Sequence, residues 1–419
     1  MKICCINLGC KVNQYEIDSI VCQLKDKCEV TQELEPADVY IVNTCAVTSE
    51  AEKKSRQFIS KITSLNKDAK ILLCGCATQN NAEQFKDKPN VKVILGTMGK
   101  GNIANYIEDN FIDVLPIDHK VYEDNLFVNE CDRIRAYVKI QDGCNNFCNY
   151  CLIPYIRGRS RSRSPESIVK EVNALSKTAK EIVITGINMS DYRIDGELAL
   201  GKLMYMLRDC PVRLRIGSLE VNVVTREFLE ILKQVKNFCP QFHLSLQNGC
   251  DKVLKEMNRH YTSSEYLEKV NLIREYFPYA GITTDLIVGY PTETDDDFEI
   301  SKQFLSKVKF SAVHYFAYSR REGTVAARLP QINGSVIKVR EMALKPIVNG
   351  LKSDFIAYNQ NNTLEVLVEE KTADYWVGYS KNYIRCYILS PKDLTNNIVK
   401  VKVIKPYKDG AIAELVEDL

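Results

Sequence analysis

Short apolar runs alternate with segments of helical periodicity along the first hundred residues. The runs that predict buried parallel strands are residues 2–7, 38–43 and 70–74. Residues 14–27 and 49–65 place apolar side chains three and four positions apart, which predicts amphipathic helices. Strands that alternate with helices predict a small parallel α/β sheet. We interpret the turn-rich, charged stretch near residues 99–132 as the second half of this domain, which passes into a linker.

A longer series of the same kind begins near residue 133. The helical patterns in it include residues 165–175, 225–235, 263–276 and 294–307. They alternate with six predicted strands at residues 136–141, 181–185, 213–217, 242–246, 282–287 and 312–317. Six strand–helix units predict a partial or complete (β/α) barrel, although the periodicity alone does not choose between a barrel and an open sheet.

The pattern changes after a helix-like stretch at residues 336–359. The short β-type runs that follow are residues 363–368, 376–379, 383–388, 398–404 and 411–415. Their regular spacing and polar turns predict a small all-β barrel. The fold class is therefore α/β with an added β-barrel, and we divide the chain into domains at residues 1–125, 130–360 and 361–419.

Composition narrows the possible locations of the protein. None of its apolar runs reaches the roughly 18 residues that span a bilayer, and the first ten residues lack a signal-peptide pattern. We therefore expect a cytoplasmic protein without a membrane partner. The 56 basic and 54 acidic residues nearly cancel, so any RNA site must be a local patch. Thiols stay reduced in the cytoplasm, and the 16 cysteines are accordingly searched for metal-ligand spacing.

Cys144, Cys148 and Cys151 form the strongest chemical pattern in the sequence. Three thiolates at this spacing, in a loop after a predicted strand, can hold three irons of a cubane cluster and leave the fourth iron open to a ligand. The alternative, a structural zinc loop, would require a fourth cysteine or histidine nearby, and the neighbouring residues are Asn, Asp and Pro.

Cys10, Cys45 and Cys76 share a position although they are far apart in the sequence. Each follows a predicted parallel strand of the first domain by a few residues. The carboxyl ends of parallel strands meet at one edge of a sheet, so these thiols are expected to converge. Cysteines inside the predicted strands, such as Cys74, are interpreted as buried core residues instead.

These motifs resemble a known family. The spacing C-x-x-x-C-x-x-C with Tyr150 before the last cysteine resembles the radical S-adenosylmethionine superfamily. The three other cysteine segments resemble those of the methylthiotransferase family within it, and the C-terminal runs resemble its RNA-binding TRAM domain. The segments that carry this resemblance are Leu8-Gly9-Cys10-Lys11-Val12-Asn13-Gln14, Asn43-Thr44-Cys45-Ala46-Val47 and Gly75-Cys76-Ala77-Thr78-Gln79.

The resemblance implies cofactors and partners. It implies two [4Fe–4S] clusters, one auxiliary cluster on Cys10, Cys45 and Cys76 and one radical cluster on the later loop, together with S-adenosylmethionine. One molecule of this cofactor would supply a methyl group, and another would be cleaved to a radical that activates a C–H bond. The implied partners are a tRNA anticodon loop, a sulfur donor and a reductant such as flavodoxin or ferredoxin.

Further residues are candidates for binding the cofactor. Gly186 lies at a strand end where a ligand can approach the backbone, and Asn188, Glu220 and Gln247 can bond its amino, ribose or adenine groups. The alternative interpretation is that these residues only shape the loops and pack in the barrel. The remaining candidates are Tyr150 in the cysteine loop and Arg157, the first of four alternating arginines that favour anion binding over a solvated loop.

The segment after Cys10 favours one substrate. Lys11-Val12-Asn13-Gln14-Tyr15-Glu16 resembles the branch that acts on N6-threonylcarbamoyladenosine at position 37 of tRNA, where a methylthio group is inserted at C2. Branches that act on N6-isopentenyladenosine or on a ribosomal-protein aspartate are the alternatives. A non-catalytic iron–sulfur or zinc RNA-binding protein is the hypothesis from another class. Trp376, Tyr379, Tyr383 and Tyr387 can either stack bases or fill the barrel core.

Overall fold

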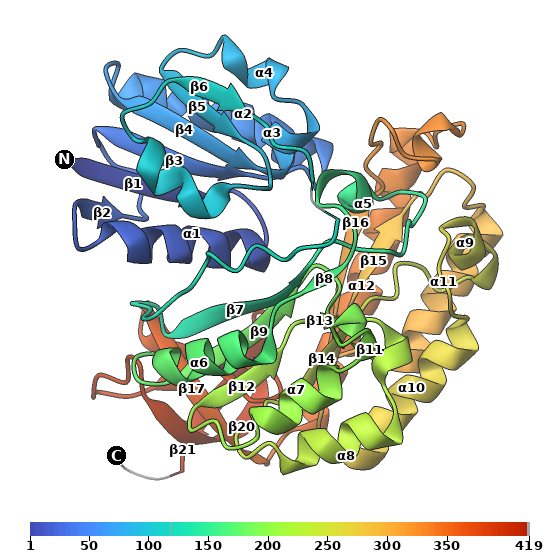
Figure 1. Ribbon diagram of the computed structural model, residues 1–419. Coiled ribbons are helices and arrows are strands. Elements are labelled where there is room, and N and C mark those ends of the chain that lie inside the picture. The colour runs from blue at the N-terminus through green and yellow to red at the C-terminus, as the bar shows by residue number, and fades with distance from the viewer. Residues whose placement is uncertain (118, 417–419) are drawn as a thin grey trace.

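The computed structural model describes residues 1–117 and 119–416, and Figure 1 shows its arrangement. The N-terminal part is a six-stranded parallel sheet in the order β2-β1-β3-β4-β5-β6. Its strands are β1 (Lys2–Asn7), β2 (Glu29–Thr31), β3 (Val39–Thr44), β4 (Lys70–Gly75), β5 (Val91–Leu95) and β6 (Phe111–Asp113). Its helices are α1 (Lys11–Leu24), α2 (Ser49–Leu65), α3 (Cys76–Asn80), α4 (Glu83–Lys86) and the 3-10 helix η1 (Lys100–Tyr106).

Both faces of this sheet are covered because its strands are apolar at consecutive positions. Ile71 and Leu73 of β4 point to one face, where they belong to the same core as Ile59 of α2. Leu72 and Cys74 point to the other face and pack in the core that contains α1. Side chains of a strand alternate between the two faces, so one apolar run supplies two cores. Cys74 is fully buried there, which confirms its interpretation as a core residue.

The central part is an open barrel of parallel strands. Its six long strands are β7 (Arg135–Asp142), β9 (Glu181–Gly186), β12 (Arg213–Ile216), β14 (Gln241–Leu244), β15 (Gly281–Val288) and β16 (Ala312–Ala317). They form two four-stranded sheets, β12-β9-β7-β8 and β13-β14-β15-β16, with the short strands β8 (Arg161–Ser162) and β13 (Ser218–Leu219). The six predicted strands and the partial barrel are thus confirmed.

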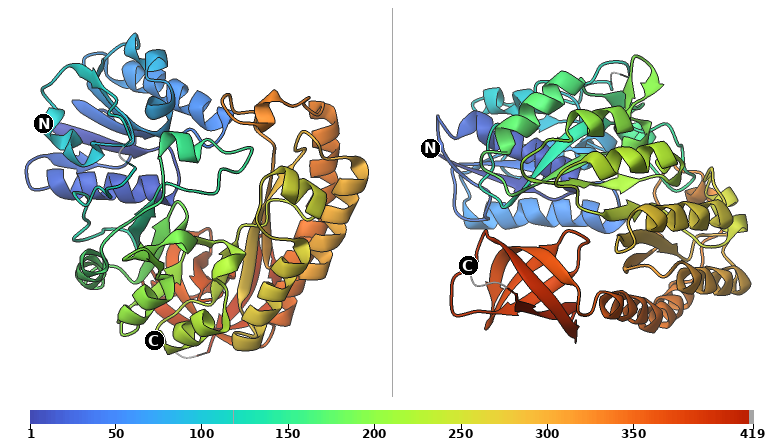
Figure 2. Two further views of the ribbon diagram at one scale, coloured as in Figure 1. Left: turned by 45° about the vertical axis from the view of Figure 1, so that its right-hand side comes forward. Right: turned by 90° about the horizontal axis from the view of Figure 1, so that it is seen from below.

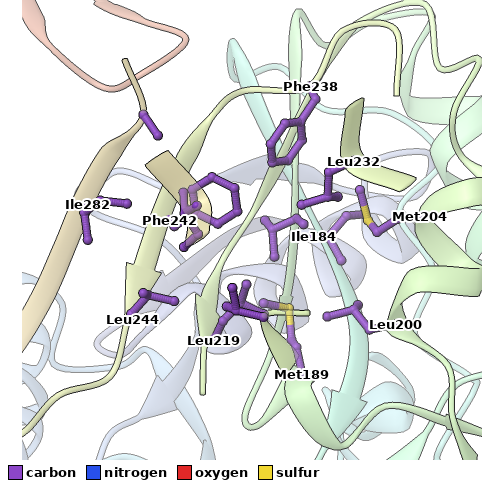
Figure 3. Packing of buried hydrophobic residues seen from close by; sticks show 14 of the residues in the cluster. Ile184, Met189, Leu200, Met204, Leu219, Leu232, Phe238, Phe242, Leu244 and Ile282 are labelled. Atoms are coloured by element: carbon purple, nitrogen blue, oxygen red, sulfur yellow. The ribbon is translucent and has the colours of Figure 1, made fainter. Parts of the chain in front are cut away.

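Helices cover the outside of this barrel (Figures 1 and 2). They are α6 (Pro165–Leu175), α7 (Leu200–Met206), α8 (Arg226–Gln234), α10 (Ser263–Tyr276) and α11 (Asp295–Val308). Figure 3 shows the core between them and the strands, where Ile184 of β9 and Phe242 of β14 face Leu200, Met204 and Leu232. The shorter elements are α5 (Ile153–Ile156), η2 (Met189–Asp191), β10 (Arg193–Ile194), β11 (Glu197–Leu198), η3 (Val221–Val223), α9 (Asp251–Glu256) and η4 (Ala326–Arg328).

The C-terminal part is a closed five-stranded barrel in the order β17-β18-β19-β21-β20, which Figure 2 shows as a separate body. The long helix α12 (Gly334–Tyr358) packs against β16 and leads into the C-terminal barrel. The strands are β17 (Thr363–Thr372), β18 (Tyr375–Ser380), β19 (Arg385–Leu389), β20 (Ile398–Tyr407) and β21 (Gly410–Leu415). Along β20, Val399, Val401 and Val403 point inward while the residues between them face out, as a half-buried strand requires. The predicted all-β barrel is confirmed.

Our division at residues 1–125, 130–360 and 361–419 stays a prediction, and among the described residues no helix or strand crosses its limits. Within the same described ranges, no helix is both long and apolar enough to cross a membrane.

Candidate functional site

Three strand ends bring Cys10, Cys45 and Cys76 together; we call them the N-terminal trio. They follow β1, β3 and β4, which are neighbours in the parallel sheet, so their loops share one edge. Cys45 and Cys76 are buried and Cys10 is exposed. Burial raises the pKa of the Cys45 thiol to about 11, and the neighbouring Cys76 and Cys10 thiols act in the same direction.

The end of β4 needs a glycine to reach this edge. Gly75 has φ +111°, and a Cβ there would lie 2.4 Å from Asn43 Oδ1 and 2.5 Å from the Thr44 carbonyl oxygen. Any other residue would therefore collide with β3 and adopt a strained backbone. Asn13 links the loops further, because its Nδ2 donates to Asn43 Oδ1 at 3.1 Å and to the Thr44 carbonyl at 3.1 Å. The position of Cys76 next to Cys45 is thus built into the backbone.

Cys144, Cys148 and Cys151, the loop trio, lie between β7 and α5. Burial raises the pKa of Cys144 to about 11 and that of Cys151 to about 12, with Cys148 adding to both shifts. Side chains from other barrel loops donate to these sulfurs: Asn188 Nδ2 lies 3.8 Å from Cys144 Sγ, and Arg259 Nη1 lies 3.3 Å from Cys148 Sγ. Such N–H···S contacts stabilise the thiolate form that iron requires.

The residues of the two trios have the chemistry that iron–sulfur clusters require. Among the described residues, neither trio nor any other group of His, Cys, Asp and Glu side chains closes around one point as a bound metal ion requires. The three thiolates of a cubane bind three different irons and therefore stand apart around a volume. Both trios have free thiols and N–H donors of this kind, so the residues present fit [4Fe–4S] clusters, and the ligand sets stay predictions.

One cavity of about 200 Å³, which we call the shared cavity, is lined by Cys151 of the loop trio and by residues that directly follow Cys45 of the N-terminal trio. Ala46 and Thr48, just after Cys45, form one wall of it, and Cys151 forms another. Tyr150 and Gln247, two of the residues expected to bind the cofactor, also line it. A group held there would touch the surroundings of both trios at once.

Asn188 and Glu220 line a second cavity of about 220 Å³ beside the cysteine loop, which we call the side cavity. Asn146 Nδ2 donates to Glu220 Oε1 at 3.3 Å, which ties the cysteine loop to this wall. Gly186 ends β9 two residues before Asn188, and a Cβ there would lie 2.9 Å from Met189 Cγ. The expected cofactor residues are therefore divided between two cavities on either side of the loop trio.

Arg157 lies in neither cavity. Its side chain is 1% exposed, Nη1 donates to Glu16 Oε1 and Asp142 Oδ1 at 3.1 Å each, and Nε donates to Cys76 Sγ at 3.2 Å. The structure thus places Arg157 against the N-terminal trio and two carboxylates of the chain itself. Its role in binding S-adenosylmethionine stays a prediction that these contacts do not favour.

Sequence reasoning missed the buried ionic network around Arg157. Lys100 Nζ lies 2.5 Å from Glu16 Oε2, and Lys139 Nζ lies 2.8 Å from Asp142 Oδ2. Burial alone would raise the pKa of Glu16, but Arg157, Lys100 and Lys139 outweigh it and hold that pKa well below its ordinary value. Lys139 could have indicated this network, because it is a charged residue in the middle of an apolar strand.

Sequence reasoning also missed Arg259. Besides its contact with Cys148, it forms an ion pair with Glu220 and donates from Nε to Tyr261 Oη at 3.1 Å. Arg259 therefore connects the loop trio with the side cavity.

The barrel aromatics divide into two pairs. Trp376 and Tyr387 are buried, and Trp376 Nε1 donates to the Ser390 carbonyl at 3.2 Å. Tyr379 and Tyr383 stack on each other with ring centroids 4.7 Å apart, and the guanidinium of Arg135 lies over both rings. Tyr379 and Tyr383 line a cavity that a ligand can enter.

An open parallel barrel whose first strand is followed by a C-x-x-x-C-x-x-C loop defines a radical S-adenosylmethionine protein. A family model described as "Radical SAM superfamily" matches residues 138–305, and one described as "Uncharacterized protein family UPF0004" matches residues 2–96. The solved radical S-adenosylmethionine methyltransferase TsrM from Kitasatospora setae is similar in fold, with a TM-score of 0.57 at 15% identity over 78% of this chain and 77% of that one.

Curated relatives extend the similarity over nearly the whole chain. "Threonylcarbamoyladenosine tRNA methylthiotransferase MtaB" of Bacillus subtilis (strain 168) is 36% identical over 98% of this chain and 96% of its own. "tRNA-2-methylthio-N(6)-dimethylallyladenosine synthase" of Thermoanaerobacter sp. (strain X514) is 32% identical over 98% of this chain and 91% of its own. The chain belongs to the radical S-adenosylmethionine methylthiotransferase family. Membership implies [4Fe–4S] clusters and S-adenosylmethionine as its cofactors.

Proposed function

We propose that the protein is a tRNA methylthiotransferase that replaces the C2 hydrogen of N6-threonylcarbamoyladenosine at position 37 with a methylthio group. The observation that carries this proposal is the shared cavity, which lies between Cys151 of the loop trio and the residues that directly follow Cys45 of the N-terminal trio. A reaction that removes hydrogen at one centre and delivers sulfur at another needs both centres within reach of one carbon atom. Similarity to the MtaB relatives supports threonylcarbamoyladenosine as the target.

In this proposal each trio holds one [4Fe–4S] cluster. When bound, the clusters and S-adenosylmethionine supply the one-electron chemistry, the sulfur and the methyl group. The chain supplies the ligands and the N–H donors that neutralise charge on them, with Arg157 on Cys76, Asn188 on Cys144 and Arg259 on Cys148.

The remaining residues of the two cavities bind the cofactor and orient the reacting groups. Asn188 and Glu220 form the polar wall of the side cavity, where they can accept and donate hydrogen bonds to the amino and ribose groups of S-adenosylmethionine. Gln247 and Tyr150 line the shared cavity and limit where an adenine ring can lie. The apolar residues Ile153 and Ile287 in the same wall exclude water from the reacting carbon.

The proposed partners are the anticodon loop of tRNA, a sulfur donor and a low-potential reductant such as flavodoxin or ferredoxin. A reductant is required because cleavage of S-adenosylmethionine to a radical consumes an electron. These partners place the proposed reaction in the cytoplasm.

The test is anaerobic reconstitution followed by assays on three anticodon stem-loop RNAs. They carry threonylcarbamoyladenosine, isopentenyladenosine or unmodified adenosine at position 37. We expect about eight irons per chain for two clusters. We also expect deoxyadenosine formation with dithionite, and a methylthio product, detected by mass spectrometry, from the first RNA.

Two results would redirect the proposal. Methylthio product from the isopentenyl RNA alone would assign the protein to the second group of curated relatives. Zinc instead of iron, with no cofactor cleavage, would favour the non-catalytic RNA-binding alternative.

A further inference from the structure

A larger cavity of about 520 Å³ lies in the interior of the open barrel, and we call it the lower cavity. Residues of the central strands, α12 and the C-terminal barrel line it. The charged and imidazole side chains on which the argument depends are Lys11, Arg215, His243, Asp285, His314 and Lys352.

The lower cavity has cations without counterions. Arg215 is neutralised by Glu181, with Nε 2.7 Å from Oε1. For Lys11 and Lys352, in contrast, the described residues offer neither a hydrogen bond nor an ion pair to the ammonium group. Lys11 is exposed and Lys352 is partly buried, and two unpaired ammonium groups that line one cavity form a site for an anion.

The pKa of His314 is lowered by burial and also by the charges of Lys352 and Lys11, while Asp285 acts in the opposite direction. A carboxylate bound beside these lysines would oppose the lowering, because an opposite charge favours the cationic form of the imidazole.

The lower cavity continues to the cysteine trios. Asp285 lines both the lower cavity and the shared cavity, so the two spaces meet at its side chain. Its Oδ2 lies 3.4 Å from His243 Nε2. Lys11 is also tied to the N-terminal trio by the chain itself, because it directly follows Cys10.

From the shared cavity past Asp285 to the lower cavity, the polar side chains follow the order of the groups in a threonylcarbamoyl nucleoside. In adenine, C2 and the N6 substituent lie at opposite ends of the Watson–Crick edge. A base with C2 in the shared cavity therefore directs its N6 substituent toward the lower cavity. The urea N–H groups would then approach the Asp285 carboxylate, and the threonine carboxylate would reach the ammonium groups of Lys11 and Lys352.

We propose that the lower cavity is the specificity site for the N6 substituent, with Lys11 and Lys352 binding its carboxylate. This inference rests on the proposed function. An uncharged isopentenyl group would form no ion pair with either cation, so it would lack the binding energy that the carboxylate gains there. The same surroundings would make a neutral carboxamide a poor substitute for the carboxylate.

The test measures kcat/KM for methylthio transfer by the reconstituted holoenzyme on two stem-loop RNAs. One carries threonylcarbamoyladenosine, and the other carries the same group with its carboxylate converted to a carboxamide. We expect the native protein to prefer the carboxylate by about tenfold or more. Lys11→Met and Lys352→Met should each lose about 10- to 100-fold on the carboxylate RNA and little on the carboxamide RNA.

Lys345→Met is the matched control, because it removes the same charge from an exposed position of α12 and should behave as the native protein. Iron content and deoxyadenosine formation without RNA establish that each variant is folded and loaded. Equal rates on the two RNAs in the native protein, or equal losses on both in the variants, would overturn the inference while the proposed function stands. Failure of the native protein on threonylcarbamoyl RNA, with activity on isopentenyl RNA, would overturn the proposed function instead.

Discussion

The two cysteine trios are assembled in different ways. The loop trio lies within eight residues of one segment after β7, so its geometry is set by a single loop. The N-terminal trio comes from three strand ends separated by more than thirty residues each, and only the parallel sheet brings them together. The first arrangement can be recognised from spacing alone, whereas the second depends on topology.

Their surroundings differ as well. Arg157, which donates to Cys76, belongs to a buried ionic network with Glu16 and Asp142 that joins α1 to β7. Arg259, which donates to Cys148, pairs with Glu220, whose side chain is 18% exposed at the side cavity. The N-terminal trio is thus integrated into the interface between two parts of the fold, while the loop trio faces space that a cofactor can enter.

The largest expected effect separates the two trios by function. Cys144→Ala should abolish deoxyadenosine formation, because the cluster that cleaves the cofactor would lose a ligand. Cys76→Ala should preserve deoxyadenosine formation and abolish methylthio transfer. The measurements are deoxyadenosine and methylthio nucleoside by mass spectrometry.

Iron analysis controls this comparison, since each variant should fall from about eight irons to about four. If Cys76→Ala also stopped cofactor cleavage in a protein that retained four irons, the division of labour between the trios would be wrong.

A smaller effect concerns stability. Arg157→Met should lower the free energy of unfolding of the iron-free protein by about 3–5 kcal/mol, because Glu16 and Asp142 would lose a buried partner. Arg259→Met should cost less, about 1.5–3 kcal/mol, since water can reach Glu220. Thermal unfolding followed by circular dichroism ranks the variants.

Arg193→Met serves as the surface control, since Arg193 is half exposed and its ion pair with Asp191 should contribute less than about 1 kcal/mol. An Arg157→Met protein as stable as this control would show that the ionic network is not what joins α1 to β7.

Most of the architecture could be predicted from periodicity. All six long barrel strands and the five strands of the C-terminal barrel have apolar patterns that their burial explains. The sequence analysis did not predict β2 and β6, which have three residues each, β5, which follows a turn at Asn90 with φ +69°, or the two-residue strands of the central part. β2 and β6 are the edges of the N-terminal sheet, and short edge strands acquire their structure from pairing with a neighbour, so a linear pattern contains little of that information.

The candidate site was less predictable where contacts are long-range. Both cysteine trios could be proposed from spacing and strand ends. Arg157 was expected to bind the cofactor because it follows the cysteine loop, but its partner Glu16 lies 141 positions away. Because such ion pairs depend on how two domains pack, neither residue alone indicates the other.

The smallest expected effect tests the boundary of the N-terminal trio. Cys74 lies two residues before Cys76, but it points into the core on the α1 side of the sheet and is fully buried. Burial raises its pKa to about 12, as it does for Cys151, so the position of Cys74 in the core, and not its pKa, argues against a role as an iron ligand. Cys74→Ala should leave iron content, deoxyadenosine formation and methylthio transfer unchanged, and it should cost about 1 kcal/mol for the small cavity created. A loss of about four irons in this variant would instead make Cys74 a ligand, and the edge defined by the ends of β1, β3 and β4 would no longer account for the auxiliary cluster.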